Sequence, residues 1–177
     1  MMSGFEILFA GFGGQGILSM GKFIAYAGME EGKNVSWLPS YGPEMRGGTA
    51  NCSVIITEDE VGSPIVTAPD VLIVMNRPSL DKFEAFIKPG GILIMDSDLI
   101  DREPMRNDIA IIKVAAQSTA EQLGSRTAAN MVMLGSLLHE TEVVSEDTLL
   151  RVLYEHGKKS FYDINKKALQ CKSCVRI

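Results

Sequence analysis

The sequence predicts a single α/β domain over residues 1–177, with a Rossmann-like, mostly parallel sheet, helices on both faces and at least one antiparallel strand. A short apolar run ends in a glycine-rich turn and is followed by a helical pattern. Three near-continuous apolar runs of strand length come later, and such runs are typical of parallel strands covered on both faces. The length of 177 residues and the 46% content of hydrophobic residues fit one compact domain.

The first elements follow from the pattern at the start of the chain. Residues 5–11 form the first apolar run, and residues 15–31 carry apolar side chains at helical spacing, with Gly32 as the helix stop. Residues 34–38 resume a strand pattern, which completes a predicted βαβ unit. Residues 49–57 alternate small or polar with apolar residues and follow without an intervening helix, so this strand is predicted to differ in direction.

The central part of the sheet is predicted from the three apolar runs. These strands cover residues 71–75, 92–95 and 109–114. Between the first two, residues 79–88 form a short helix with one apolar face. After the last, Ser118–Glu121 has the Ser-x-x-Glu form of a capping box, which predicts that a helix begins there.

Two further helices are predicted in the last third of the chain. Residues 127–139 are apolar on nearly all sides, which a helix tolerates only when it is buried by its own fold or by a partner. Both explanations stay open at the level of the sequence. Residues 145–159 read as an ordinary amphipathic helix, capped by Ser145, with acidic residues in its first turn and lysines in its last.

Composition and charge exclude several classes of function. The formal net charge is -5 and the 17 Lys and Arg residues are scattered, so no basic stripe is expected to bind nucleic acid. No run reaches the roughly 18 consecutive apolar residues of a membrane span, and the first residues lead into a strand pattern rather than a signal peptide. The three cysteines do not form the pattern of a disulfide framework. We therefore expect a cytoplasmic protein with no nucleic acid and no membrane partner.

The first candidate site is the glycine-rich turn, which matches G-x-G-x-x-G between a strand and a helix. Backbone N–H groups and the helix dipole favour anions at such a turn. A dinucleotide site also needs an acidic residue about 20 positions later, but residues 36–40 contain none. Close packing of strand and helix, contact with a phosphate-bearing ligand and contact with a partner's backbone all stay open. The candidate cofactor-binding residues are Gly11, Gly13, Gly14, Gln15 and Gly16.

A second candidate site follows the second predicted strand. Residues 41–48 combine a tyrosine, an acid and an arginine with glycines and a proline, so polar groups lie on backbone that can approach a ligand closely. A solvated turn with a weak Glu–Arg pair is the alternative. Asn76 and Arg77 follow a buried strand, where Asn76 can equally serve as a helix cap. The candidate residues at this active-site edge are Tyr41, Glu44, Arg46, Gly47, Gly48, Asn76 and Arg77.

Three other sets of residues do not support a site of their own. Asp96 and Asp98 have no histidine or further carboxylate near them in the sequence, so turn and cap roles are favoured over a metal site. The Cys171–Cys174 pair offers two ligands, whereas a zinc or iron–sulfur site needs about four. His139 and His156 lie in helical stretches without a nucleophile nearby. We assign no catalytic residue and no metal site to this chain.

Three stretches together resemble the gamma subunit of 2-oxoacid:ferredoxin oxidoreductases. They are Gly11–Leu18, Ser40–Cys52 and Met75–Ser79, and the resemblance extends over nearly the whole chain. Residues 44–52 have the sequence Glu-Met-Arg-Gly-Gly-Thr-Ala-Asn-Cys. This motif resembles that of the 2-oxoglutarate class rather than that of the pyruvate class, where Arg-Arg-Gly-Ala-Pro is typical.

The resemblance implies a multisubunit enzyme in which this chain is not active alone. Thiamine diphosphate with Mg and 4Fe-4S clusters would be held by partner subunits, CoA would be the co-substrate, and ferredoxin would accept the electrons. Alpha and beta subunits would be the partners, and the sequence leaves open whether a ferredoxin-like delta subunit joins them. The chain has neither a Gly-Asp-Gly magnesium motif nor a set of cluster cysteines.

The resemblance also suggests a role for the two candidate sites. We expect residues 11–16 and 41–48 to form one edge near the catalytic centre, with Arg46 steering an anionic substrate or the phosphates of CoA and Glu44 orienting Arg46. A stand-alone dinucleotide-binding oxidoreductase and a purely structural assembly subunit are the alternative functions.

Overall fold

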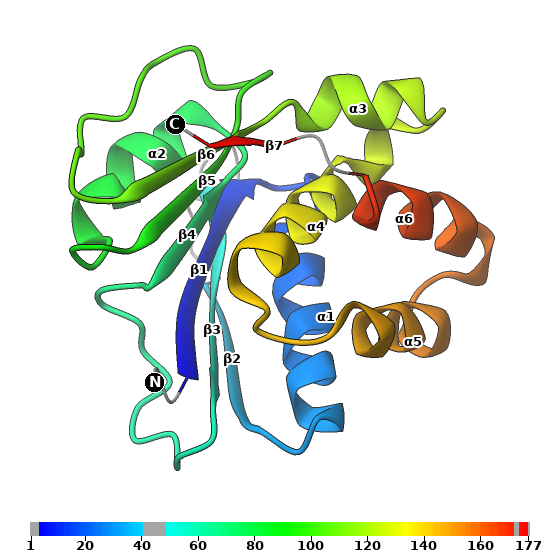
Figure 1. Cartoon of the computed structure of the whole chain (residues 1–177), viewed down its shortest axis with the longest axis horizontal. Helices are drawn as coiled ribbons and strands as arrows, with labels where there is room; N and C mark the ends of the chain where they lie inside the picture. Colours follow the sequence, from blue (N-terminus) through cyan, green and yellow to red (C-terminus); the bar gives the residue numbers. More distant parts are fainter. Residues whose placement is uncertain (1–3, 41–48, 172–173, 177) are drawn as a thin grey trace.

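A seven-stranded mixed sheet forms the centre of the computed structural model, which describes residues 4–40, 49–171 and 174–176 (Figure 1). The strands follow the order β2-β3-β1-β4-β5-β6-β7 across the sheet. Strands β1, β4, β5 and β6 pair in parallel, whereas β3 and β7 run antiparallel to their neighbours. The strands are β1 (Gly4–Phe12), β2 (Asn34–Ser40), β3 (Thr49–Thr57), β4 (Val71–Val74), β5 (Ile92–Asp96), β6 (Ala110–Val114) and β7 (Cys174–Arg176).

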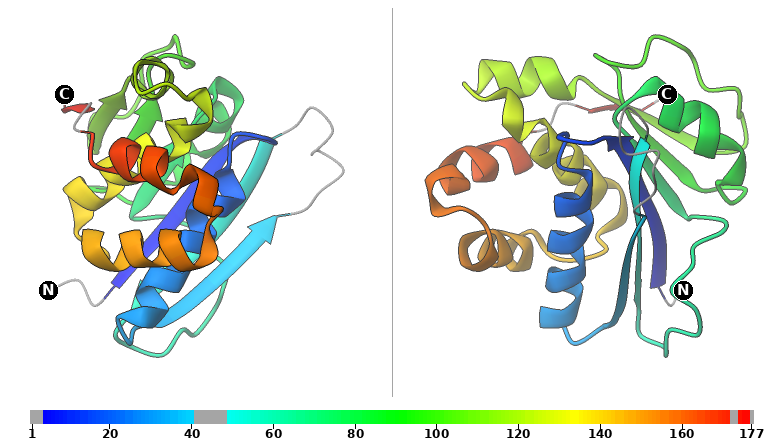
Figure 2. Two further views of the ribbon diagram at one scale, coloured as in Figure 1. Left: turned by 90° about the vertical axis from the view of Figure 1, so that its right-hand side faces the viewer. Right: turned by 180° about the vertical axis from the view of Figure 1, so that it is seen from behind.

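Helices cover both faces of the sheet, but unequally (Figure 2). One face packs against α1, α3, α4, α5 and α6 in the larger apolar core, and the other packs against α2 in a smaller core. The predicted α/β fold with helices on both faces is therefore confirmed. The helices are α1 (Ile17–Glu30), α2 (Arg77–Phe83), α3 (Ala116–Gln122), α4 (Ala129–Thr141), α5 (Glu146–His156) and α6 (Tyr162–Leu169). Short 3-10 turns are η2 (Glu84–Phe86), η3 (Arg126–Ala128) and η4 (Lys159–Phe161).

Within the part of the chain that the structure describes, no helix has both the length and the apolar character that crossing a lipid bilayer requires.

Strand β3 lies between β1 and β2, so the two strands of the predicted βαβ unit run in the same direction without being neighbours. Alternate side chains of β3 face α1, and Cys52, Val54 and Ile56 are nearly or fully buried there. Two glycines of α1 let the helix approach closely, since a Cβ at Gly21 would lie 2.5 Å from the Cys52 Sγ and one at Gly28 would lie 3.1 Å from Ile56. The period-2 pattern of β3 therefore serves the packing of α1.

The apolar segment 127–139 becomes α4, a helix that its own fold buries. Helix α6 packs so closely on it that a Cβ at Gly135 would lie 2.1 Å from the Leu169 carbonyl oxygen. The first of the two sequence-based explanations is therefore correct for this helix. Helix α6 and strand β7 were not predicted, and the predicted helix over residues 145–159 ends as α5 at His156.

The predicted capping box at Ser118 is wrong, because α3 begins two residues earlier, at Ala116. The carboxylate of Asp98 instead accepts bonds from the Ser118 N–H (2.7 Å) and the Ser118 hydroxyl (2.9 Å). An acid from the preceding loop thus caps the free N–H groups of this helix. The predicted cap at Ser145 is confirmed, since its Oγ accepts from the Thr148 N–H at 3.1 Å.

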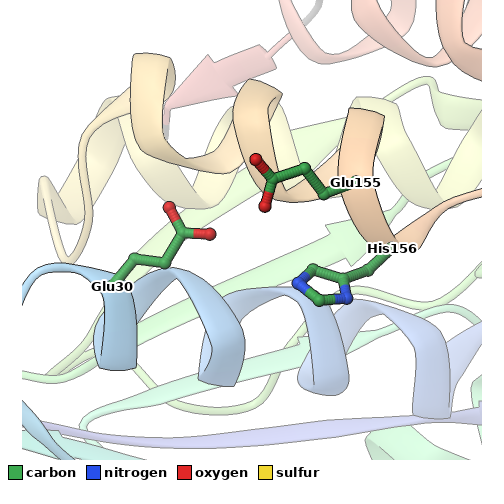
Figure 3. A group of neighbouring side chains, drawn as sticks. All are labelled: Glu30, Glu155 and His156. Carbon is green, nitrogen blue, oxygen red and sulfur yellow. The ribbon is translucent and has the colours of Figure 1, made fainter.

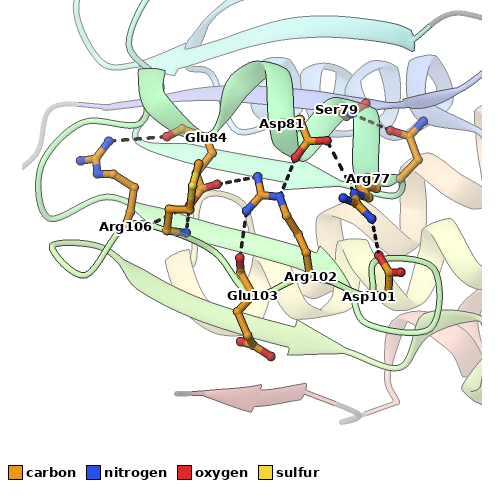
Figure 4. Close-up of polar contacts among 10 residues, drawn as sticks. Arg77, Ser79, Asp81, Glu84, Asp101, Arg102, Glu103 and Arg106 are labelled. Atoms are coloured by element: carbon orange, nitrogen blue, oxygen red, sulfur yellow. Dashed lines mark hydrogen bonds and ion pairs between the residues drawn. The ribbon is translucent and has the colours of Figure 1, made fainter.

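A polar network holds the loop after β5 against α2 and η2 (Figure 4). Glu84 is buried and accepts bonds from Arg102 Nη2 (2.7 Å) and from the N–H groups of Met105 and Arg106. Arg102 Nε also donates to Asp81 at 2.5 Å. Because a buried carboxylate is costly unless it is fully bonded, this network fixes the loop rather than leaving it free.

Candidate functional site

The glycine-rich turn lies at the carboxyl end of β1 and leads directly into α1. Gly14 has φ +92° and Gly16 has φ +76°, and only glycine adopts such values without strain. Gly16 is the N-cap of α1, and no side chain caps this helix among the described residues. The first-turn N–H groups of α1 therefore have no intrahelical acceptor, and the positive end of the helix dipole faces this edge of the sheet.

Gln15 ties this turn to the end of the neighbouring strand. Its Oε1 accepts from the Phe12 N–H at 2.6 Å, and its Nε2 donates to the Met75 carbonyl oxygen at 2.9 Å. A Cβ at Gly11 would lie 2.6 Å from the same Oε1, so glycine is needed there as well. The amide of Gln15 thus positions the turn through two bonds within the protein.

A cavity of about 190 Å³ lies beside the turn. It is lined by Gly14, Gln15, Met75, Gln117, Arg126, Thr127, Ala129 and Asn130. This volume is smaller than the roughly 300–1,000 Å³ typical of sites for drug-sized ligands. The cavity therefore suits a small anion or one charged group of a larger ligand.

Asn130 is the most informative side chain in this cavity. It is only 8% exposed, and it lines the cavity. A Cβ at Gly16 would lie 2.3 Å from its Nδ2, so the amide lies directly against the N-cap of α1. The amide carries two N–H donors and a carbonyl acceptor. It is thus a donor and acceptor that a ligand could satisfy.

Arg126 supplies a cationic group at the rim of the cavity. Its side chain is 73% exposed and pairs with Glu121 at 2.9 Å. Exposed pairs of this kind contribute about 0–1 kcal/mol, so a ligand could take Arg126 from Glu121 at little cost. Gln117 also lines the cavity, and its Nε2 donates to Asp96 at 2.9 Å.

Asp96, behind Gln117, is fully buried at the end of β5. Burial raises the pKa of its carboxyl above the ordinary value, although bonds from Gln117 and from the Asp98 N–H oppose this shift. Its Oδ1 accepts from the Asp98 N–H at 3.1 Å. Asp96 and Asp98 therefore have the turn and cap roles that were predicted for them.

The structure brings the first candidate site and the strand end before Asn76 together, through the bond from Gln15 to Met75. Asn76 caps α2, because its Oδ1 accepts from the Ser79 N–H at 2.8 Å, while its buried Nδ2 has no partner among the described residues. Arg77 pairs instead with Asp101 at 3.2 Å and belongs to the polar network of the α2 face (Figure 4).

The second candidate segment, with Tyr41, Glu44, Arg46, Gly47 and Gly48, lies outside the described residues. Its flanking strands end at the edge of the sheet that carries the glycine turn. Thr49 is paired with Phe12 in the register of β1 and β3, and Ser40 is paired with Asn51.

Sequence reasoning missed Gln117, Arg126 and Asn130, which lie about a hundred residues after the turn and reach it only through the fold. One signal was present for Asn130. It is an amide side chain within the largely apolar segment 127–139, and a buried polar residue in such a helix needs a partner.

The described cysteines give no reactive group at this site. Burial raises the pKa of the Cys52 thiol to about 12, so it stays protonated beneath α1. Cys171 follows α6 and does not line the cavity beside the turn. The polar groups around the cavity can bind and orient an anion.

Comparison with known proteins agrees with this fold. The family described as pyruvate ferredoxin/flavodoxin oxidoreductase matches residues 6–171. Ketoisovalerate oxidoreductase subunit VorA of Methanothermobacter marburgensis is 43% identical over 93% of this chain, which spans only 35% of the length of VorA. 2-Oxoglutarate synthase subunit KorC of Methanocaldococcus jannaschii is 32% identical over 90% of this chain and 87% of KorC.

A solved structure has the same architecture over nearly all of its length. The gamma subunit of a keto/oxoacid ferredoxin oxidoreductase from Geobacter sulfurreducens superposes with a TM-score of 0.83 and 33% identity, over 94% of each chain. Sequence and fold therefore agree over nearly all residues, and the chain belongs to the pyruvate ferredoxin/flavodoxin oxidoreductase family.

Proposed function

We propose that this chain is the gamma subunit of a multisubunit 2-oxoacid:ferredoxin oxidoreductase. The observation that carries the proposal is the end-to-end likeness to the Geobacter sulfurreducens gamma subunit, which covers 94% of both chains. The complex would catalyse the CoA-dependent oxidative decarboxylation of a 2-oxo acid to an acyl-CoA and pass electrons to ferredoxin. Alpha and beta subunits, and in some complexes a ferredoxin-like delta subunit, would complete it.

The residues of this chain do not fit the cofactors of that reaction. Three cysteines are too few for a 4Fe-4S cluster bound within the chain, and the described residues around the cavity include no carboxylate pair that could hold the magnesium of thiamine diphosphate. We therefore propose that partner subunits hold thiamine diphosphate with Mg and the clusters. Because the three cysteines do not form the sequence pattern of a disulfide framework, we place the complex in the cytoplasm.

The contribution proposed for this chain is an anion-binding edge beside the catalytic centre. The uncapped start of α1, the amide of Asn130 and the exposed Arg126 converge on one small cavity. We propose that this cavity and residues 41–48 bind the phosphates of CoA or the carboxylate of the substrate, with Arg46 as the steering cation and Glu44 orienting it.

Removal of either arginine tests this edge. Arg46→Ala and Arg126→Ala in the assembled complex should each raise the apparent KM for CoA or for the 2-oxo acid by roughly tenfold, since a charge-assisted hydrogen bond contributes about 1.5–3 kcal/mol. Lys158→Ala, after α5, is the matched control and should leave both values unchanged. Unchanged turnover and affinities in both arginine variants would remove the proposed role.

We propose 2-oxoglutarate as the preferred substrate. The motif at residues 44–52 resembles that of the 2-oxoglutarate class, and KorC of Methanocaldococcus jannaschii matches over 90% of this chain. A branched-chain 2-oxo acid is the second candidate. The specific observation in its favour is the 43% identity to the ketoisovalerate oxidoreductase subunit.

A substrate panel on the native complex separates these candidates. The tagged chain would be purified without air from its own cells, and the eluate assayed for reduction of a low-potential dye that depends on both CoA and a 2-oxo acid. We expect partner chains in the eluate and the highest kcat/KM with 2-oxoglutarate. Highest activity with ketoisovalerate or pyruvate would keep the family and overturn the substrate assignment.

Two alternatives predict different results. A stand-alone dinucleotide-binding oxidoreductase requires tight NAD(H) binding by the isolated chain, which the small cavity and the absence of an acid in residues 36–40 do not favour. A purely structural assembly subunit requires that variants of the edge break assembly while every intact complex keeps normal kinetics.

A further inference from the structure

Helices α1 and α5 pack antiparallel against each other and carry three potential metal ligands (Figure 3). Glu30 is the last residue of α1, and Glu155 and His156 are the last residues of α5. One ligand atom from each residue lies within 4.8 Å of the other two, and all three residues are exposed. This cluster lies on the helical side of the molecule and is separate from the glycine turn.

We propose that Glu30, Glu155 and His156 bind a divalent transition-metal ion of the Zn²⁺ type. One imidazole nitrogen and two carboxylate oxygens form a mixed ligand set that suits such ions, whereas Mg²⁺ and Ca²⁺ prefer oxygen ligands alone. Glu155 and His156 end α5, so the partial negative charge of that helix C-terminus also favours a cation here. Three protein ligands would leave a fourth, tetrahedral position open to water.

The surrounding contacts orient two of the three ligands before any ion binds. The His156 ring stacks on Tyr26 at 4.5 Å with an interplanar angle of 12°. Arg151 Nε donates to Glu30 Oε2 at 2.9 Å, which leaves the other oxygen of that carboxylate for a metal. A hydrogen bond to a ligating carboxylate is the usual second support of a metal site.

The third ligand and the nearby cations decide how strong the site can be. Glu155 has no hydrogen-bond or ion-pair partner among the described residues, so its carboxylate need not be released from another group. Two basic side chains lie nearby, Arg151 on Glu30 and Lys22 over the Tyr26 ring at 5.6 Å, and their charge opposes a cation. We therefore infer reversible binding that bridges α1 and α5.

Zinc binding by the full chain tests this site independently of the proposed function. All cysteines would be replaced by serine, since thiolates compete for zinc. Titration calorimetry should show one saturable Zn²⁺ site, and Zn²⁺ should raise the melting temperature, because a ligand that binds the folded state stabilises it. Loss of a hydrogen bond that supports a metal ligand weakens metal binding by roughly tenfold. Because His156→Gln and Glu155→Gln each remove a ligand itself, each should weaken Zn²⁺ binding by more than that.

His139→Gln is the matched control, because His139 is also exposed and is the only other histidine of the chain. Binding of Zn²⁺ should be unchanged in this variant. The proposal is overturned if the cysteine-free chain shows no saturable site at millimolar Zn²⁺. It is also overturned if His156→Gln binds Zn²⁺ as tightly as the parent chain does.

Discussion

At the scale of single residues, three glycines of the same turn differ in what a side chain would meet. A Cβ at Gly13 would have no atom within 4 Å, and the backbone of this residue does not have positive φ. Gly14 has positive φ but open space around it. Gly16 combines positive φ with a Cβ position 2.3 Å from Asn130 Nδ2. The turn therefore needs glycine at position 14 for its positive φ, and at position 16 both for positive φ and for the space beside Asn130.

This difference predicts a graded series of stabilities. Gly16→Ala should lower the free energy of unfolding by about 2–4 kcal/mol, from left-handed strain and from overpacking against Asn130. Gly14→Ala should lower it by about 1–2 kcal/mol from strain alone, and Gly13→Ala should stay within about 0.5 kcal/mol. Urea unfolding of the three variants measures the series. Equal stability of Gly13→Ala and Gly16→Ala would show that the described turn geometry is wrong.

The candidate site could be predicted from sequence only in its local part. The glycine turn is a contiguous motif whose strand and helix follow from short-range periodicity, so its place was predicted correctly. Asn130 and Arg126 join it because α4 packs against α1, β5 and β6, and pairing between distant segments leaves no local pattern. The segment around Arg46 stays a prediction.

At the scale of elements, the buried strands were the most predictable and the helix ends the least. β4 and β5 are covered on both faces, so a continuous apolar run was a sufficient signal. The position of β3 between β1 and β2 depends on long-range pairing that the local sequence does not show. The error at α3 has the same cause, because its cap, Asp98, comes from twenty residues earlier in the chain.

The cap supplied by Asp98 has a measurable consequence. Asp98→Ala should destabilise the chain by about 1 kcal/mol, the usual cost of a lost helix cap. Ser118→Ala removes only the exposed hydroxyl partner and should cost about 0.5 kcal/mol or less. Urea unfolding at neutral pH compares the two variants. If Ser118→Ala proved the more damaging, the capping box predicted from sequence would have been the better description.

At the scale of the whole molecule, the same domain occurs alone and as part of longer chains. It covers 87% of KorC from Methanocaldococcus jannaschii but only 35% of VorA from Methanothermobacter marburgensis. Its two apolar cores are formed by its own helices and strands, and even the apolar helix α4 is buried without a partner. A unit of this kind can be joined to its partners either covalently or by docking.

The most direct test of the proposed subunit role is reconstitution with and without this chain. The partner subunits would be assembled anaerobically with their cofactors, and dye reduction dependent on a 2-oxo acid and CoA would be measured before and after stoichiometric addition of the purified chain. The account predicts little activity without the chain and full activity after it joins the complex. Full activity in its absence, or failure of the chain to join the complex, would contradict it.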